Sequence, residues 1–216
     1  MNPDQLRSAL DETLRDRRLL DHPFYRRWNA GELQLEELAA YAEQYAHFER
    51  VLPAMLRSLE GALGEDPAAE LVRQNRIDEE TAPEPHVQLF GRFAAAVGAN
   101  PDAPATPATT QLVDTYKELV ELDPVAGLGG FVAYETQAAS IAASKAEGLR
   151  RRYGVGAAAT EFWDVHATMD VTHADWTIEA LARLASDADD VAAPARRAAD
   201  AWWAFLDERE AAAPRH

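Results

Sequence analysis

The chain has 216 residues, and 37 acidic against 21 basic side chains give it a formal net charge of −16. So acidic a chain repels phosphate backbones and anionic lipid headgroups, and we therefore expect neither nucleic acid nor a membrane as a partner. The sequence contains no cysteine, which excludes disulfides, thiolate zinc sites and a cysteine nucleophile. It shows no signal-peptide layout and no apolar run of bilayer-spanning length, so we expect a cytoplasmic protein.

Apolar residues recur at helical spacing along nearly the whole chain, and no stretch alternates with the period of a strand, which predicts an all-α fold. The first helix is predicted to begin at Pro3 and to be followed by a loop that includes His22-Pro23 and residues 29–31. A long helix is then predicted from Leu35 to about Leu63, with a kink where Pro53 removes a backbone hydrogen bond.

Six further helices follow from the apolar pattern and from the proline and glycine residues that bound them. They are predicted over residues 67–80, 85–98, 111–121, 130–153, 158–185 and 191–210. The proline-rich segment 100–109 is the one clear loop. Neither side of this loop contains a complete bundle, so we predict seven or eight helices in a single domain over residues 1–216.

The strongest local motif consists of His166, Asp170 and His173. Offsets of four and three residues place these side chains on one stripe of a helix, at a spacing typical of metal ligands. A helix rises roughly 10.5 Å over this segment, which suits Asp170 lying between two ions about 3.5–4 Å apart rather than both histidines binding one ion. The alternative is a polar stripe on the surface of an acidic helix.

A dinuclear site in a bundle needs ligands from facing helices, so we looked for carboxylates and histidines in apolar surroundings. Glu135 qualifies because alanines line the helix turns that follow it; the alternative is a glutamate that complements the helix dipole. His86 precedes an apolar run, and Glu79 stands seven residues before it. Together with the first motif these residues supply three imidazoles and three carboxylates, a set that suits iron or manganese better than structural zinc.

Four runs of the sequence extend this pattern. They are His22-Pro23-Phe24-Tyr25, Tyr41 with Gln44-Tyr45, Tyr134-Glu135-Thr136-Gln137 with Lys145, and Phe162 with His166, Asp170 and His173. In combination they resemble the haem-oxygenase-like dinuclear metal oxidases, and most of all the branch of the chlamydial death-domain-associating protein (CADD), with PqqC and TenA as more distant relatives. The resemblance covers about Leu19 to Trp176.

The resemblance implies a seven-helix haem-oxygenase-like bundle and a homodimer. It also implies two iron ions, or one iron and one manganese ion, that activate O2 with electrons from an external reductant. The family's six ligands fall on the residues already collected: Glu79, His86, Glu135, His166, Asp170 and His173. Whether Glu79 or its neighbour Glu80 is the ligand stays open, because the residues around them depart from the family pattern.

The same branch makes para-aminobenzoate for folate synthesis by consuming one of its own tyrosines, with a nearby lysine as the candidate amine source. The matching positions are Tyr25, Tyr45, Tyr134 and Lys145. Tyr134 and Lys145 are eleven residues apart, which returns to within about 20° on a helix, so they share a stripe. These tyrosines also fit a purely structural role in the core.

Three alternatives remain. The first is a dinuclear oxidase that acts on an external small amino acid or fatty acid. The second is a metal-free PqqC-like enzyme, which would leave the histidine and aspartate stripe unexplained; a TenA-type hydrolase would need a cysteine. The third is a non-enzymatic interaction protein, although no exposed apolar stripe supports one.

Overall fold

The computed structural model describes residues 1–212, and this part of the chain consists of helices joined by loops, with no strand. Nine α-helices and two short 3-10 turns occur in it. The α-helices are α1 (Pro3–Thr13), α2 (Pro23–Ala30), α3 (Leu35–Leu63), α4 (Ala68–Thr81), α5 (His86–Ala96), α6 (Pro107–Leu122), α7 (Pro124–Arg152), α8 (Ala157–Leu184) and α9 (Asp189–Ala211). The predicted all-α class is confirmed, while the last four residues of the predicted domain lie outside the described part. No described helix combines the length and the apolar character needed to cross a membrane.

The predicted count of seven or eight helices, and the seven that the resemblance implied, are wrong, because α2 occupies the segment that we expected to be a loop. His22 caps this helix, its Nδ1 accepting a hydrogen bond of 3.1 Å from the backbone amide of Phe24, and Pro23 fills the first turn. Gly31 ends it with a φ of 77°, in the left-handed region that favours glycine. These are ordinary start and stop signals, but the helix between them is only 8 residues long.

Helix α7 begins at Pro124, six residues before the predicted start at Gly130. The Asp123 side chain caps it by accepting a hydrogen bond of 2.8 Å from the amide of Ala126. A glycine in the first turns of this helix allows close packing, because a Cβ on Gly127 would lie 2.6 Å from a methyl carbon of Leu59 in α3. This close approach brings α7, with Glu135 and Lys145, into the centre of the bundle.

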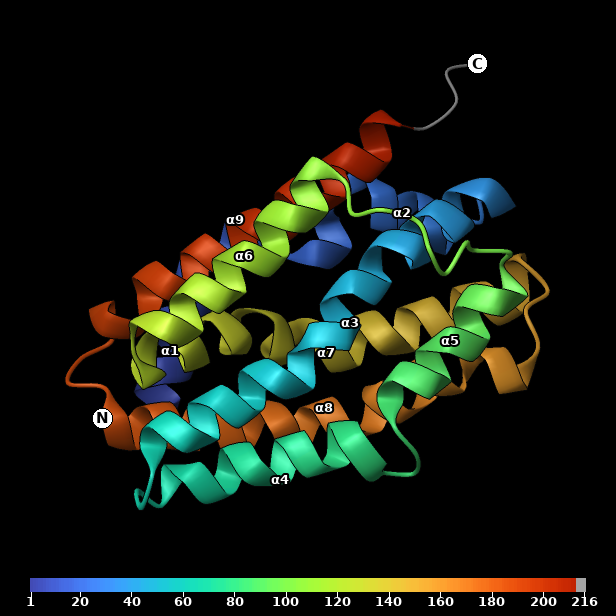
Figure 1. The fold of residues 1–216 in the computed structure, drawn as a ribbon. Coiled ribbons are helices and arrows are strands. Elements are labelled where there is room, and N and C mark those ends of the chain that lie inside the picture. The colour runs from blue at the N-terminus through green and yellow to red at the C-terminus, as the bar shows by residue number, and fades with distance from the viewer. Residues whose placement is uncertain (213–216) are drawn as a thin grey trace.

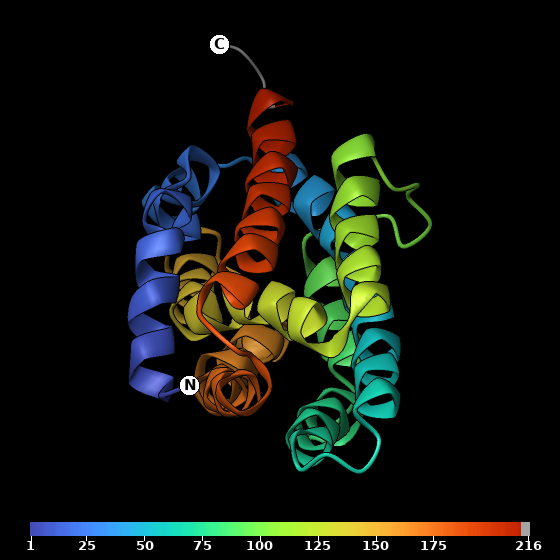
Figure 2. The ribbon, with the colours of Figure 1, turned by 90° about the vertical axis from the view of Figure 1, so that its left-hand side faces the viewer.

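Helices α7 and α8 pack side by side along much of their length, with α4 and α5 also in contact with α8 (Figure 1). Figure 2 views α8 nearly end-on, while α9 and α6 run across the bundle over α7. The N-terminal amino group donates a hydrogen bond of 2.7 Å to the carbonyl of Ala182, which fixes the start of the chain beside α8. The site described below lies where α3, α4, α5, α7 and α8 meet.

Candidate metal centre

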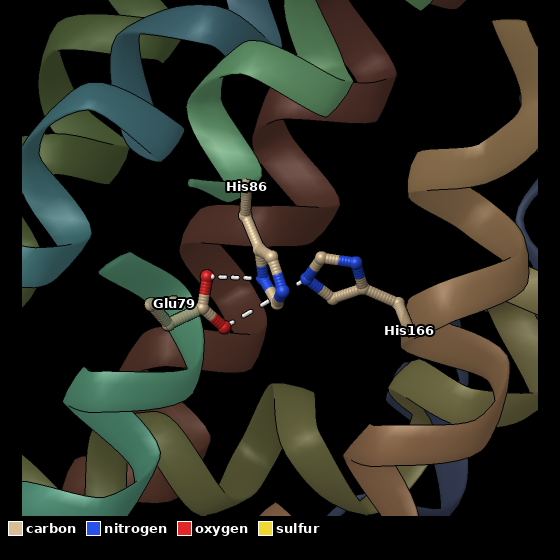
Figure 3. A group of neighbouring side chains, drawn as sticks. All are labelled: Glu79, His86 and His166. Atoms are coloured by element: carbon tan, nitrogen blue, oxygen red, sulfur yellow. Dashed lines mark hydrogen bonds and ion pairs between the residues drawn. The ribbon is translucent and has the colours of Figure 1, made fainter. Parts of the chain in front are cut away.

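Glu79, His86 and His166 converge from α4, α5 and α8, and one donor atom of each lies within 4.8 Å of the others. The Nδ1 atom of His86 lies 2.7 Å from one carboxylate oxygen of Glu79, and the Nε2 atom of His166 lies 3.7 Å from the other (Figure 3). All three side chains are buried. Two imidazoles and a carboxylate on facing helices form a donor set that suits iron or manganese.

Backbone carbonyls fix which nitrogen of each histidine faces this carboxylate. The Nε2–H group of His86 donates a hydrogen bond of 2.9 Å to the carbonyl of Ala82, which directs Nδ1 toward Glu79. The Nδ1–H group of His166 donates one of 2.8 Å to the carbonyl of Phe162, which directs Nε2 toward the same residue. Such outer hydrogen bonds set the tautomer and the ring orientation of metal-ligating histidines.

The other three predicted ligands lie nearby, on α7 and α8. The Nδ1 atom of His173 is 3.4 Å from a carboxylate oxygen of Asp170, and its Nε2 atom is 3.2 Å from a carboxylate oxygen of Asp78. Asn75 donates a hydrogen bond of 2.9 Å to one oxygen of Glu135, while the second oxygen is buried and has no hydrogen-bond partner in the described structure. A buried carboxylate oxygen without a partner is costly, and a bound cation would satisfy it.

All six predicted ligands are brought to one place. Five of them line a cavity of about 30 Å³, and His86 flanks it through its contact with Glu79. The side chains around this cavity are Tyr45, Phe48, Glu49, Leu52, Asn75, Glu79, Tyr116, Phe131, Tyr134, Glu135, Ala138, His166, Asp170 and His173. Glu49, Asn75 and Asp78 are not among the residues predicted from the sequence. Glu49 is 4% exposed in α3, between an apolar residue and an exposed arginine, and no local pattern distinguishes it from a surface glutamate.

The cavity concentrates negative charge that burial makes unfavourable. Burial, together with the charge of Glu79, raises the pKa of Glu49 to about 8, and burial raises the pKa of Glu135 to about 7. Burial alone would lower the pKa of a histidine, yet the nearby carboxylates raise that of His166 to about 10 and that of His173 to about 9. Protons therefore supply the positive charge that metal ions would supply in the loaded protein.

The geometry distinguishes Glu79 from Glu80. Glu80 is half-buried and forms ion pairs with Arg57 and with Arg76, the latter over 2.6 Å, at the outer side of α4. Glu79 is 5% exposed and points toward the histidines. Glu80 is thus paired with arginines, and Glu79 is the one of the two glutamates that lies among the predicted ligands.

A second cluster, next to the cavity, contains the predicted tyrosines and the predicted lysine. Lys145 Nζ donates a hydrogen bond of 2.6 Å to the Tyr41 hydroxyl, which lies 2.9 Å from the Tyr25 hydroxyl. Tyr45 stacks on Tyr41 with ring centroids 5.5 Å apart, and its hydroxyl lies 2.8 Å from that of Tyr134. The four tyrosines form a continuous path from the cavity to Lys145, and Tyr41 is the member that sequence reasoning did not single out.

The amino group of Lys145 lies in an aromatic cage, 4.1 Å from the ring centre of Trp163 and 4.6 Å from that of Tyr25. Burial lowers the pKa of Lys145 well below its usual value, although the charge of Glu49 opposes the shift. The lysine side chain is 2% exposed. Burial thus favours the neutral form of this amine, which is the nucleophilic form.

Lys145 and Tyr134 share a stripe of α7, as predicted, but the structure does not bring them into contact. Tyr134 bonds to Tyr45 and stacks on Trp202, with ring centroids 4.7 Å apart, whereas Lys145 reaches Tyr41. Eleven residues of helix correspond to a rise of roughly 16 Å, so one stripe spans two separate layers of the core.

Residues 39–203 match the family described as iron-containing redox enzymes. The chain is 36% identical to the 4-aminobenzoate synthase of Nitrosomonas europaea, over 96% of this chain and 92% of that protein. In fold it is similar to a CADD-like protein from Nostoc punctiforme, with a TM-score of 0.76, 18% identity and 98% of both chains covered. A domain with a haem-oxygenase-like fold from Shewanella denitrificans gives a TM-score of 0.74 at 16% identity, over 96% of this chain and 90% of that chain. These likenesses confirm the predicted haem-oxygenase-like fold.

Proposed function

This chain belongs to the family of iron-containing redox enzymes, and we propose that it forms 4-aminobenzoate from one of its own tyrosine side chains in an O2-dependent reaction. The observation that carries the proposal is the hydrogen-bonded series Lys145, Tyr41 and Tyr25, which places a buried amine beside tyrosines next to a cluster of metal-ligand type. A lysine in a core is rarely retained without a role, because its desolvation destabilises the fold.

The donor set divides into two groups that would each hold one metal ion. Glu79, His86 and His166 would hold the first. The second would lie between Glu135, Asp170 and His173, where the unpartnered oxygen of Glu135 provides a free donor. We propose two iron ions, or one iron and one manganese ion; when bound, they would activate O2 with electrons from an external reductant.

The side chain of tyrosine and 4-aminobenzoate have the same carbon skeleton, a para-substituted ring that bears one further carbon. Conversion requires that the Cα–Cβ bond breaks, that Cβ is oxidised to a carboxylate and that nitrogen replaces the phenolic oxygen. O2 would be the oxidant of the tyrosine side chain. The Lys145 nitrogen would replace the phenolic oxygen, which leaves as water, and hydrolysis of the C=N bond then formed to Cε would release the ring amine and leave an aldehyde on the lysine side chain. We assign Tyr25 as the consumed residue, because its ring centre lies 4.6 Å from the lysine nitrogen and its hydroxyl bonds to Tyr41.

The other tyrosines connect the two parts of the site. Tyr45 and Tyr134 line the metal cavity, and their paired hydroxyls can pass a proton as an electron leaves one ring. Tyr41 bonds to both Lys145 and Tyr25 and so positions amine and ring against each other. The surrounding aromatic side chains exclude water, which protects oxidised side chains from side reactions.

The size of the cavity favours an internal over an external substrate. A volume of about 30 Å³ holds one or two water molecules but no amino acid or fatty acid. A metal-free PqqC-like reaction would not explain why buried carboxylates and histidines converge on one cavity. We therefore favour the self-consuming reaction.

The decisive experiment loads the protein with Fe²⁺, with and without Mn²⁺, in the absence of O2, measures the bound metal and then admits O2 with a reductant. Protein labelled with ¹⁵N-lysine should release ¹⁵N-4-aminobenzoate, and peptide mass spectrometry should locate the mass loss at Tyr25. Two metals per chain with O2 uptake but no product or mass change would contradict the self-consuming reaction and favour an external substrate. Absence of metal binding would contradict the redox site altogether.

A further inference from the structure

A second hollow, of about 150 Å³, lies between α3 and α5, and small side chains create it. Helix α3 presents Ala42 and Ala46 to it, one turn apart, and α5 presents Gly91, Ala94 and Ala95. Residues three or four apart on a helix share a face, so both helices have a stripe of small residues where they oppose each other. The lining is mainly apolar. The hollow exists because alanine and glycine stand at positions where larger side chains would fill the space.

The inner end of this hollow reaches the metal cavity through one side chain. Glu49 lines both the hollow and the cavity that contains the predicted ligands. Beside it, Phe90 forms part of the hollow and stacks on Tyr45, with ring centroids 5.2 Å apart. Glu49 and the Phe90–Tyr45 pair therefore form the wall between the two spaces.

Two hydrogen bonds fix the outer end of the hollow. The backbone amide of Asn100 donates a hydrogen bond of 2.9 Å to the carboxylate of Glu43. Arg50 donates one of 2.9 Å to the carbonyl of Pro101. Both bonds join α3 to the segment after α5, so the rim of the hollow is anchored on α3.

We propose that this hollow is the access route and transient binding place for O2. Glu49 lies between the hollow and the metal cavity, and O2 moves past its side chain to reach the cavity. A lining of alanine and glycine favours a small, neutral and apolar molecule. The proposal rests on the proposed function, because it assumes that O2 is consumed in the cavity.

The first test uses the metal-free protein and xenon, an apolar gas that fills dry cavities. Gly91→Phe should fill the hollow without a backbone clash, since a Cβ at Gly91 would meet no atom within 4 Å. The matched control is Gly61→Phe, at another helical glycine with the same free space but outside the hollow. ¹²⁹Xe NMR should detect bound xenon in the wild type and in the control but not in Gly91→Phe. Equal xenon binding in all three proteins would overturn the proposal.

The second test measures the reaction of the reduced, metal-loaded protein with O2 by stopped-flow absorbance. Gly91→Phe and Ala46→Leu should lower the second-order rate constant for O2 several-fold at unchanged metal content, whereas Gly61→Phe should leave it unaltered. Loss of xenon binding without any change in that rate constant would also overturn the route. If the wild type does not react with O2 at all, the proposed function fails, and the xenon experiment shows separately whether the hollow binds gas.

Discussion

The side-chain nitrogen of Lys145 lies 2.6 Å from the hydroxyl oxygen of Tyr41, although 104 residues separate them in the sequence. The contact joins α7 to α3 in the centre of the bundle, next to the metal cavity. A lysine on a core helix usually extends to water, but here five aromatic rings surround the amino group within 5.8 Å. The fold has thus enclosed an amine among tyrosines, which is the arrangement that the proposed reaction requires.

Replacing Lys145 with methionine should abolish 4-aminobenzoate formation and leave the metal content unchanged, because Lys145 does not line the metal cavity. The free energy of unfolding should remain within about 1 kcal/mol of the wild type or increase, since methionine fills a similar volume without a buried amine. Product analysis, metal analysis and urea denaturation check the three expectations. Lys117→Met, at the exposed second lysine of the chain, should have no effect on product. Continued product formation by Lys145→Met would contradict its role as the nitrogen source.

Two single substitutions should distinguish a dinuclear from a mononuclear centre. His166→Ala removes a donor from the group with Glu79 and His86, and His173→Ala removes one from the group with Asp170. Each variant should lose about one of two metal ions, because the other group keeps its donors. Elemental analysis after anaerobic loading measures this. His47→Ala, a half-buried histidine bonded to the carbonyl of Ala103, is the control. Loss of all metal in both variants would indicate a single shared site.

The sequence predicted the stripe of His166, Asp170 and His173 because all three lie on one helix, where spacing alone determines the shared face. Glu49 and Asp78 could not be found in this way. Their roles depend on which helix packs against them, and a glutamate in α3 has no mark in the sequence that distinguishes burial from exposure.

Two other differences from the sequence-based expectations also arise because packing partners are not encoded locally: the expected loop contains α2, and Tyr134 and Lys145 do not meet. Helix α2 is too short to show apolar periodicity, so its caps, His22 and Gly31, were interpreted as loop residues. Periodicity fixed the direction of Tyr134 and Lys145 around α7 but carried no information about which layer of the core each reaches. Angular position is a local property of the chain, whereas contact partners are a property of the packed bundle.

Tyr134→Phe should uncouple O2 consumption from product formation. The variant loses the hydroxyl contact with Tyr45, and with it the hydrogen-bonded link at the cavity end of the tyrosine path. We expect unchanged metal content, continued O2 uptake and a product yield reduced several-fold, with a stability loss of about 1 kcal/mol. The control Tyr153→Phe, which loses its contacts with Leu33 and Trp28 outside the cavity, should keep the yield. Equal yields from both variants would remove Tyr134 from the path.

The stability of the metal-free protein should depend on pH through Glu49. Its pKa is about 8 in the folded protein, whereas an unfolded glutamate titrates near its ordinary value of about 4.3. Between these values the folded protein holds a proton that the unfolded chain has released, so raising the pH favours unfolding. This contribution is fully present below the unfolded pKa and is lost as the pH rises through the folded one.

Relative to Glu49→Gln, the wild type should therefore lose free energy of unfolding between about pH 5 and pH 8, by at most about 1.4 kcal/mol per pH unit. The raised pKa of His173 acts in both proteins and cancels in the comparison, whereas the difference includes the part of the His166 shift that the Glu49 charge causes. Urea denaturation in the presence of a chelator, at several pH values, measures the difference. Glu179→Gln, at an exposed position of α8, should follow the wild type. Parallel stability curves for the wild type and Glu49→Gln would show that Glu49 is already ionised in the fold, and then protons would not take the place of the metal's charge at this side chain.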